Sequence, residues 1–388
     1  MNRRDFLAAS AALSTASPLL LAGANAQPLQ NQRASDLIVH TTSPMNAEPQ
    51  LANLVKGFMT PTDQFYIRSH APNPKIDPVS FRLKVEGLVE RELSISLSEL
   101  ANDYTNVGVT ATLTCAGNRR YEHSKVSPIK GVPWREGAIG NAQWGGVPLA
   151  AILKKAGVKQ EAKHVWFEGL DEIEKGGGII PFGGSIPILK AMDSSEKMPG
   201  ALVVTEMNNQ PLTPDHGYPV RTVVPGYIGA RSVKWLGKIV VSDRPSPNHY
   251  VATAYKVVER ADAIEWAEKA PIYRYILNSA ICTPAIGEQV KAGELTVRGY
   301  SLPFGDAGRT VAKIEVSADA GKSWVQAKLG TTGAYCWRLW EASVPIAATT
   351  KGLVVRATDS AGKTQPQFVD WNKKGYLFNA WHKVPVKV

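Results

Sequence analysis

The last third of the chain alternates apolar and polar side chains, and this pattern constrains the fold more than any other feature of the sequence. A period of two residues places successive side chains on opposite faces of a β-strand. Short turns such as Asp306–Gly308 and Asp319–Gly321 separate the alternating segments, which cover residues 295–300, 311–317, 334–344 and 353–357. Strands of this length joined by tight turns predict a β-sandwich.

The part of the chain before these strands mixes short strands with short helices. Pro148 begins one predicted helix and Gly157 ends it, as these residue types commonly do. The mixture lacks a regular alternation of strand and helix, and it therefore predicts an α+β domain. We expect strands at 81–85, 107–113, 164–169 and 201–206, and helices at 97–102, 148–156 and 186–192.

Helix patterns nearly vanish from about residue 265 onward. We therefore place the domain boundary between Ala261 and Pro271. The sequence thus predicts an α+β domain over residues 27–265 and a β-sandwich over residues 266–388. Residues 27–60 are expected to form a polar, irregular lead-in to the first domain.

Residues 1–26 have the pattern of an export signal. Arg3-Arg4 and Phe6-Leu7 precede an apolar stretch, and Ala24-Asn25-Ala26 supplies a cleavage site with small residues. The stretch is short and interrupted by Ser, Thr and Pro, which argues against a membrane span. The twin arginine indicates the Tat pathway into the periplasm, with an ordinary Sec signal as the alternative. Because Tat exports folded proteins, it suits a chain that carries an inserted cofactor.

The chain carries a net charge of +10. A positive field raises the rate at which a protein meets anions, so an anionic substrate or an acidic partner is one interpretation. A solvated basic surface is the other. The sequence has no run of Lys and Arg, no zinc-finger spacing and no aromatic RNA-binding motif, and we therefore do not expect nucleic-acid binding.

Cys115, Cys282 and Cys336 are the only cysteines, so at least one thiol is free and a disulfide scaffold is excluded. Cys115 follows a strand pattern and precedes Arg119-Arg120, whose charge favours a thiolate. Gly117 permits the close approach of a large ligand. These residues alone leave three hypotheses open, namely a buried structural thiol, a nucleophile and a metal ligand. We interpret Cys282 and Cys336 as thiols that bind no metal.

The segment Thr114–Arg120 closely resembles the molybdenum-ligating segment of the sulfite oxidase family, and further matches follow the family order. Tyr66–Pro72 is similar to the family's Arg-x-His segment. The resemblance covers the chain from about Asp63 to the C-terminus. The remaining matching segments are 215–221, 223–226, 229–235, 254–256, 337–340 and 379–382.

The resemblance implies a molybdenum–molybdopterin cofactor with Cys115 as the single protein ligand to the metal. Its phosphate needs cations and hydrogen-bond donors, which His, Arg and Lys provide. The residues implied to hold the cofactor are Tyr66, Ile67, Arg68, Ser69, His70, Cys115, Asp171, His216, Arg221, Ser232, Val233 and Lys234. The residues implied to form the sulfite pocket are Arg68, Arg120, Trp134, Tyr255 and Arg338.

The same resemblance implies how the protein is assembled and where its electrons go. The second domain would be an immunoglobulin-like dimerisation domain, which implies a homodimer. Animal relatives carry an N-terminal haem domain, but here residues 27–60 contain a single histidine, His40, and the chain has no Cys-x-x-Cys-His motif. We therefore expect no haem in this chain and an external acceptor, with a c-type cytochrome as the leading candidate.

Two other hypotheses remain beside sulfite oxidation. The first is a sister molybdoenzyme with the same fold, either a sulfane dehydrogenase or a methionine-sulfoxide reductase. The reductase type lacks the second domain, and the sulfane type agrees less well with Arg68-Ser69-His70 together with Cys115–Arg120. The more remote hypothesis is a secreted binding protein without a cofactor.

Overall fold

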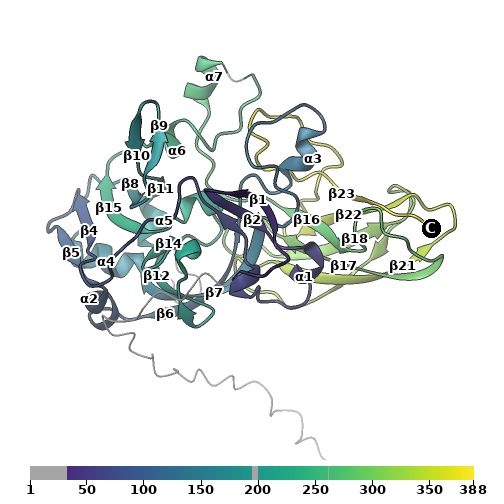
Figure 1. The fold of residues 1–388 in the computed structure, drawn as a ribbon, viewed down its shortest axis with the longest axis horizontal. Coiled ribbons are helices and arrows are strands. Elements are labelled where there is room, and N and C mark those ends of the chain that lie inside the picture. The colour runs from purple at the N-terminus through teal and green to yellow at the C-terminus, as the bar shows by residue number, and fades with distance from the viewer. Residues whose placement is uncertain (1–32, 195–199, 261) are drawn as a thin grey trace, which may run out of the picture.

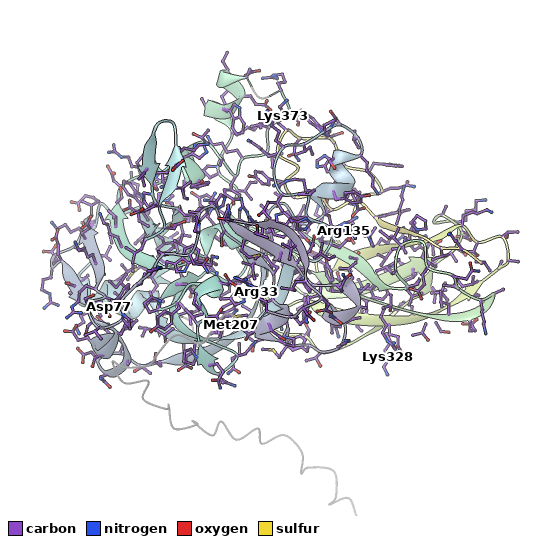
Figure 2. All side chains as sticks on the ribbon, viewed as in Figure 1. Arg33, Asp77, Arg135, Met207, Lys328 and Lys373 are labelled. Carbon is purple, nitrogen blue, oxygen red and sulfur yellow. The ribbon has the colours of Figure 1, made fainter. Side chains whose placement is uncertain are left out.

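The computed structural model describes residues 33–194, 200–260 and 262–388, so the predicted signal at residues 1–26 lies outside the described residues. The chain forms two domains that lie side by side along the longest axis (Figure 1). Arg33 and Met207 lie on the N-terminal domain, and Lys328 lies on the C-terminal one (Figure 2). In the described ranges, no helix is long and apolar enough to cross a bilayer.

Two five-stranded sheets form the frame of the N-terminal domain. The first has the order β11 (Gly183–Pro187), β8 (His164–Gly169), β15 (Leu236–Ser242), β4 (Leu83–Gly87) and β5 (Leu93–Ile95). The second has the order β13 (Gln210–Pro211), β12 (Leu202–Met207), β7 (Ile139–Pro148) and β6 (Val107–Thr114), with β14 (Arg221–Val223) also paired to β12. The smaller sheets contain β1 (Ile38–Thr42), β2 (Met45–Glu48) and β3 (Ile67–Arg68), and β9 (Ile173–Lys175) with β10 (Gly178–Ile180).

The helices of this domain are short. Helix α4 packs Ile152 and Leu153, both fully buried, into the apolar core that also contains Val165 and Ile239 of the first sheet. The α-helices are α1 (Leu51–Leu54), α2 (Leu97–Asn102), α3 (Arg120–Ser124), α4 (Leu149–Ala156), α5 (Ile188–Met192), α6 (His249–Ala252) and α7 (Ala263–Glu268). The 3₁₀ helices are η1 (Thr62–Gln64), η2 (Pro214–His216) and η3 (Gly229–Arg231).

The C-terminal domain is a sandwich of two four-stranded sheets. One sheet has the order β16 (Asn278–Thr283), β17 (Gly293–Leu302), β21 (Arg338–Ile346) and β20 (Lys328–Leu329). The other has the order β19 (Val325–Gln326), β18 (Val311–Ser317), β22 (Gly352–Asp359) and β23 (His382–Pro385). The inward side chains of both sheets form one apolar core, as the period-two pattern requires.

The structure confirms the predicted fold class, an α+β domain followed by a β-sandwich. The predicted strand 311–317 coincides with β18, and the predicted helix 97–102 coincides with α2. A capping box explains this helix, because Ser96 and Glu99 exchange hydrogen bonds between side chain and backbone.

Several predicted boundaries were wrong for identifiable reasons. The predicted helix 186–192 begins only at Ile188, because Ile186 pairs with Val165 in the sheet. Pro148 is the N-cap of α4 and not a residue of its first turn. The predicted strand at residue 334 begins only at Arg338. Tyr335 has a φ of 56°, which no strand residue adopts.

The lead-in at residues 27–60 was expected to be irregular, but its described part contains β1, β2 and α1. Strand β2 pairs with β3. Its last residue, Glu48, is fully buried, and its carboxylate accepts hydrogen bonds from the backbone N–H groups of Arg135 and Gly137 at 2.8 Å each. These long-range contacts order a segment whose composition predicts no structure.

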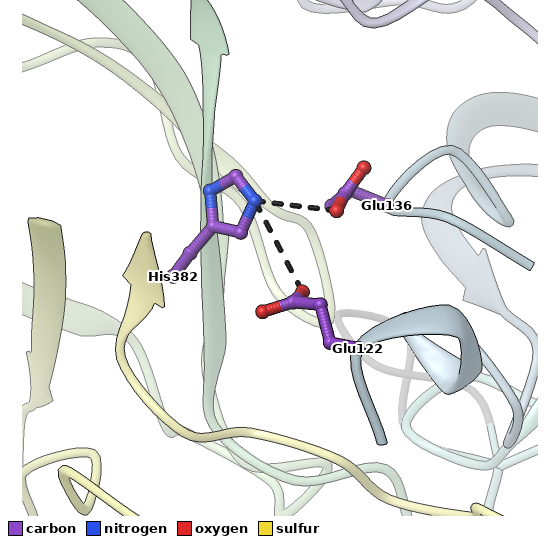
Figure 3. Close-up of side chains that lie close together, drawn as sticks. All are labelled: Glu122, Glu136 and His382. Carbon is purple, nitrogen blue, oxygen red and sulfur yellow. Dashed lines mark hydrogen bonds and ion pairs between the residues drawn. The ribbon is translucent and has the colours of Figure 1, made fainter. Parts of the chain in front are cut away.

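A buried histidine joins the two domains. His382 of β23 accepts a hydrogen bond from the Ile281 N–H at Nδ1, at 2.9 Å. The ring proton therefore lies on Nε2, which donates to Glu136 of the N-terminal domain at 3.3 Å and lies 4.0 Å from Glu122 (Figure 3). Burial opposes ionisation of Glu136, but the hydrogen bond from His382 and the charge of Arg119 outweigh it and lower its pKa to about 2.

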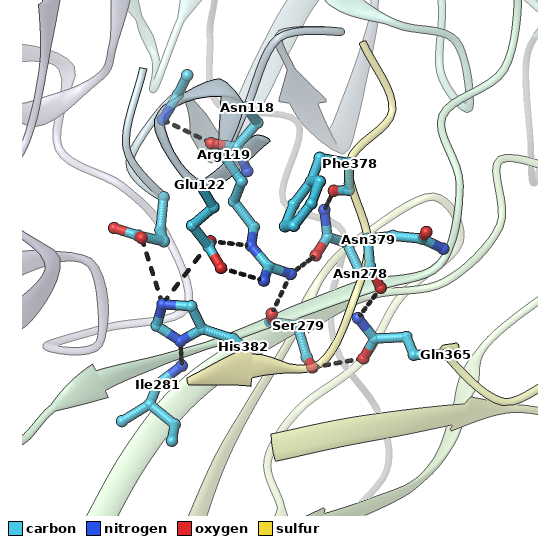
Figure 4. A network of polar contacts seen from close by, with 12 residues as sticks. Asn118, Arg119, Glu122, Asn278, Ser279, Ile281, Gln365, Phe378, Asn379 and His382 are labelled. Carbon is cyan, nitrogen blue, oxygen red and sulfur yellow. Dashed lines mark hydrogen bonds and ion pairs between the residues drawn. The ribbon is translucent and has the colours of Figure 1, made fainter. Parts of the chain in front are cut away.

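Arg119 lies at the centre of this interface and is fully buried. Its guanidinium forms a paired contact with the Glu122 carboxylate at 2.6 and 2.9 Å. It also donates to the Asn278 side chain and to the Ser279 carbonyl of the sandwich (Figure 4). The ring of Phe378 lies 5.0 Å from its central carbon. Because Arg119 is a buried charge, removing one of its partners would lower the stability of the protein.

We therefore expect Arg119→Met to destabilise the protein by about 3 kcal/mol or more, because it leaves the partly buried Glu122 carboxylate and the buried Asn278 side chain without their donor. The free energy of unfolding in urea measures the effect. The control is Arg298→Met, which breaks a pair with Glu341 whose side chains are half exposed, and which should cost about 1 kcal/mol or less. Equal losses in the two variants would contradict this account of the interface.

Candidate functional site

A deep cavity of about 660 Å³, including its open mouth, lies in the N-terminal domain. Its walls come from several separate stretches of chain, and its lining combines apolar rings with converging basic groups, as small-molecule sites do. The residues that line it are Phe65, Tyr66, Arg68, Ser69, His70, Leu113, Cys115, Asp171, Phe182, Asp215, His216, Arg221, Gly229, Ala230, Ser232, Lys234, Trp235 and Tyr255.

Cys115 lies directly after β6, which ends because its chain turns back at this residue. The Cys115 N–H still donates to the Ala138 carbonyl at 2.9 Å, and the Asn118 N–H closes the turn onto the Cys115 carbonyl at 3.0 Å. The Gly117 N–H points at the thiol sulfur at 3.4 Å. A side chain at position 117 would collide with Arg120, since a Cβ there would lie 2.5 Å from its guanidinium. The sulfur is thus presented on a rigid turn.

Three basic side chains that line the cavity lie close enough to influence one another. Burial, and then the charge of Arg221, lower the pKa of Lys234 to about 7. Burial, Lys234 and Arg221 together lower the pKa of His216 to about 4. Burial also lowers the pKa of Arg221 to about 10. Buried groups that repel each other in this way are stabilised by an anion, so this part of the cavity is an anion site.

Hydrogen bonds fix the positions of these cations. The Lys234 ammonium donates to the Ser69 hydroxyl and to the Asp215 carbonyl, each at 2.8 Å. Arg221 donates to the carbonyls of His216 and Ser232 at 3.0 and 3.2 Å. Lys234 and Arg221 therefore donate to neutral acceptors, which are backbone carbonyls and one hydroxyl. Their electric field remains available to a ligand.

Two carboxylates border the cavity without neutralising it. Asp215 accepts from Arg33 at 2.5 Å and from Asn73 at 2.7 Å. Arg33 lies near the centre of the view in Figure 2, where the lead-in crosses the domain. Asp171 accepts from the Phe182 N–H at 3.0 Å, and burial raises its pKa.

A chain of polar contacts joins Arg68, His70 and Tyr255. Arg68 donates to Nε2 of His70 at 2.7 Å, and the Tyr255 hydroxyl lies 3.4 Å from the same nitrogen. Burial, and then the charges of Arg68 and Lys234, hold the pKa of His70 well below its usual value. His70 is therefore neutral, with its proton on Nδ1. Tyr255 has a φ of 51°, an unfavourable backbone conformation that is typical of functional positions.

The cavity brings together most of the residues that the sequence had singled out. Ile67 and Val233 do not line it, although both are buried in neighbouring segments. The Val233 N–H and carbonyl bond to Thr222, which fixes the segment that carries Lys234. The residues brought together are Tyr66, Arg68, Ser69, His70, Cys115, Asp171, His216, Arg221, Ser232, Lys234 and Tyr255.

Three residues expected in the sulfite pocket lie outside the lining. Arg120 is buried beside the cavity, and its charge lowers the pKa of Tyr255 against the larger effect of burial. Trp134 is fully buried in the core, edge-on to the rings of His40 and Tyr66. Arg338 begins β21 in the sandwich and donates to the carbonyls of Gly330 and Val311. The structure does not bring Arg338 to the cavity.

The sequence reasoning missed two residues near Arg120. Burial, and then Lys175 and Arg120, lower the pKa of Lys374, so this lysine belongs to the same cationic region. Tyr376 is buried, and its ring contacts Arg120. Both lie shortly before the matching segment 379–382, and the Lys373-Lys374 pair was the available signal.

The described residues contain one other cluster with metal-ligand atoms, formed by Glu122, Glu136 and His382 (Figure 3). Nε2 of His382 is the atom that faces both carboxylates, and it carries the ring proton. A protonated nitrogen has no lone pair for a metal. In addition, Arg119 already satisfies Glu122. This cluster is a joint between the domains and not a metal centre.

Comparisons with known proteins agree with this geometry. Residues 70–250 match the oxidoreductase molybdopterin binding domain, and residues 269–388 match the Mo-co oxidoreductase dimerisation domain. The sulfite oxidase of Gallus gallus is 42% identical over 365 residues, which cover 90% of this chain and 78% of that protein. The mitochondrial sulfite oxidase of Homo sapiens is 41% identical over 91% of this chain and 66% of that protein.

A solved structure shows the same fold at lower sequence identity. The sulfane dehydrogenase SoxCD of Paracoccus pantotrophus superimposes with a TM-score of 0.76. The match covers 92% of this chain and 87% of that one, at 24% identity.

The lowered pKa of Lys234 predicts how the stability of the cofactor-free protein depends on pH. The pKa is about 7 in the folded protein and 10.5 in its reference state, so between these values the unfolded chain binds more protons. Stability from this group therefore rises with pH across that window. We expect thermal midpoints measured from pH 7 to 9 to rise less in Lys234→Met than in the wild type.

Lys238→Met is the matched control for this measurement. Lys238 lies four residues further along, on β15, partly exposed, and its neighbours Glu168 and Glu86 raise its pKa despite some burial. It remains protonated across the window in both states, so its removal should leave the slope unchanged. Equal slopes in the wild type and Lys234→Met would contradict the buried-cation account.

Proposed function

This chain belongs to the sulfite oxidase family of molybdenum–molybdopterin enzymes, and we propose that it oxidises sulfite to sulfate and passes the electrons singly to an external c-type cytochrome. The observation that carries the proposal is the cavity in which a presented thiol, a cluster of buried basic side chains and the Arg68–His70–Tyr255 contacts meet. A family identity of about 40% over most of the chain supports the substrate.

The donor set fits the cofactor. Lys234, Arg221 and His216 form the anion site that a phosphate needs, and burial, reinforced for Lys234 and His216 by neighbouring positive charge, lowers their pKa values. Cys115 contributes its thiol to the lining of the same cavity. We assign the cofactor-binding role to the lining residues named above, with Ile67 and Val233 acting through their backbone. When bound, the molybdenum centre supplies a two-electron acceptor for sulfur.

The residues of this chain would hold the substrate and the proton it releases. Arg68 and Arg120 offer planar guanidinium donors, which match the geometry of a small oxyanion. Neutral His70 accepts from Arg68 and so keeps that arginine turned toward the cavity. The Tyr255 hydroxyl, whose pKa burial raises, stays protonated and donates to whatever oxygen lies beside it. Its burial also excludes bulk water.

We further propose export by the twin-arginine pathway to the periplasm and assembly as a homodimer. Arg3-Arg4 and the apolar stretch after them support the export route. The match of residues 269–388 to a dimerisation domain supports the dimer. The net charge of +10 favours encounter with an acidic cytochrome, which is the one-electron acceptor expected in that compartment.

Molybdenum content and sulfite-dependent reduction of cytochrome c, measured on one purified sample, test this function. We expect about one molybdenum per chain and rapid reduction. Cys115→Ser should abolish turnover, since a hydroxyl is a poor replacement for a thiolate ligand. Protein that contains molybdenum but does not oxidise sulfite would move the function to sulfane sulfur or sulfoxide chemistry. Protein without molybdenum, made in a host that synthesises the cofactor, would contradict the proposal.

Arg68→Gln tests the substrate pocket. The change removes a charge-assisted contact to sulfite, and we expect the KM for sulfite to rise by about tenfold or more, with a smaller fall in kcat. Steady-state kinetics measures both. Arg82→Gln is the control, because Arg82 is exposed and donates to nearby backbone carbonyls. An unchanged KM in Arg68→Gln would remove this arginine from the pocket.

A further inference from the structure

One segment of the C-terminal domain, residues 371–378, wraps around the turn that presents Cys115. The Leu377 N–H donates to the Ala116 carbonyl at 2.8 Å. The Lys374 carbonyl accepts from Nε of Arg120, also at 2.8 Å. The Asn372 side chain bonds both the N–H and the carbonyl of Tyr376, at 3.0 and 2.9 Å. The position of Tyr376 is therefore fixed relative to the metal-ligating turn.

The ring of Tyr376 contacts two groups of the site. It stacks on the Tyr255 ring, with centroids 5.2 Å apart and planes inclined by 15°. The Arg120 guanidinium carbon lies 5.3 Å from its centroid. Only 8% of Tyr376 is exposed, so the contact with the cation is largely shielded from water. Shielding from water strengthens the attraction between a cation and the face of an aromatic ring.

The contacts of Arg120 explain why this ring matters. Nε and Nη1 donate to the carbonyls of Lys374 and Val132. Among the described residues these are its hydrogen-bond acceptors, and Nη2 remains to meet an anion. The two carbonyls fix one edge of the guanidinium plane, and the Tyr376 ring fixes its face. The Tyr255 ring stacks on Tyr376 and so restricts its position.

We propose that Tyr376 is a positioning residue that orients Arg120 toward the substrate anion. The inference rests on the proposed function, because it assigns Arg120 to the sulfite pocket. It adds a residue from the C-terminal domain that the sequence motifs do not contain. The ring carries this role rather than the hydroxyl, because both the stack on Tyr255 and the contact with Arg120 involve the ring face.

Substitution of Tyr376, read out by anion binding as well as turnover, tests this role. Tyr376→Leu removes the ring and should raise the KM for sulfite by about tenfold, with kcat changed by about threefold or less. The dissociation constant of sulfate, measured on the purified holoenzyme by calorimetry, should rise by a similar factor. Tyr376→Phe keeps the ring, and both constants should stay within about twofold of the wild type. Tyr376→Met replaces the leucine variant if that protein does not fold.

Phe378→Leu is the matched control. Phe378 lies on the same segment and makes the same kind of contact, but with Arg119 of the domain interface. Its loss should lower the thermal midpoint and leave the sulfite KM and the sulfate affinity unchanged.

The outcomes separate the two proposals. A leucine variant with unchanged KM and sulfate affinity overturns the positioning role, and so does a phenylalanine variant that loses as much as leucine. A wild-type protein that does not oxidise sulfite refutes the proposed function instead. In that case the sulfate measurements on the same variants still decide whether Tyr376 orients Arg120.

Discussion

The site depends on a single constraint, the fixation of the turn after Cys115 against the C-terminal domain. Arg119 stands four residues after the cysteine and is buried among Glu122, Asn278 and Ser279. A buried guanidinium is tolerated only where its donors are satisfied, so the turn and the sandwich must meet in one arrangement. Asn118 adds a bond to the Tyr300 hydroxyl at 3.0 Å, which in turn donates to the Glu136 carbonyl. The geometry of the thiol is therefore set from outside its own domain.

The properties of the charged groups in the cavity also depend on which partners they contact. Carboxylates lie nearby, yet Asp215 is engaged by Arg33 and Asn73, and burial raises the pKa of Asp171. The basic side chains lie in a region of low dielectric, where their interaction with a bound anion is strong. Such a pocket is costly without its ligand, and the cost explains why the pKa values of Lys234 and His216 are low. The structure is built for a bound anionic cofactor.

The sequence predicted what depends on local patterns and on motifs. Strand β18 and helix α2 follow from alternation and from a capping box, and the family resemblance predicted eleven of the lining residues, ten of them within the matching segments. The lead-in escaped prediction because β2 is ordered by partners far along the chain, such as the N–H of Arg135. Arg338 was assigned to the pocket because it stands in a matching segment, whereas its carbonyl partners hold it in the sandwich. A position within a matching segment does not by itself bring a side chain to the cavity.

Tyr376 and Lys374 show the converse case, in which residues outside any motif belong to the site. They reach it because residues 371–378 leave the sandwich, cross the Cys115 turn through the Leu377–Ala116 bond and return at β23. The returning strand begins with His382, which is tied to Glu136 beside the same turn. The crossing segment is thus anchored at both ends to the element it positions. Any displacement of the C-terminal domain would move Arg120 and the thiol together, so this domain sets the geometry of a cavity that its own residues do not line.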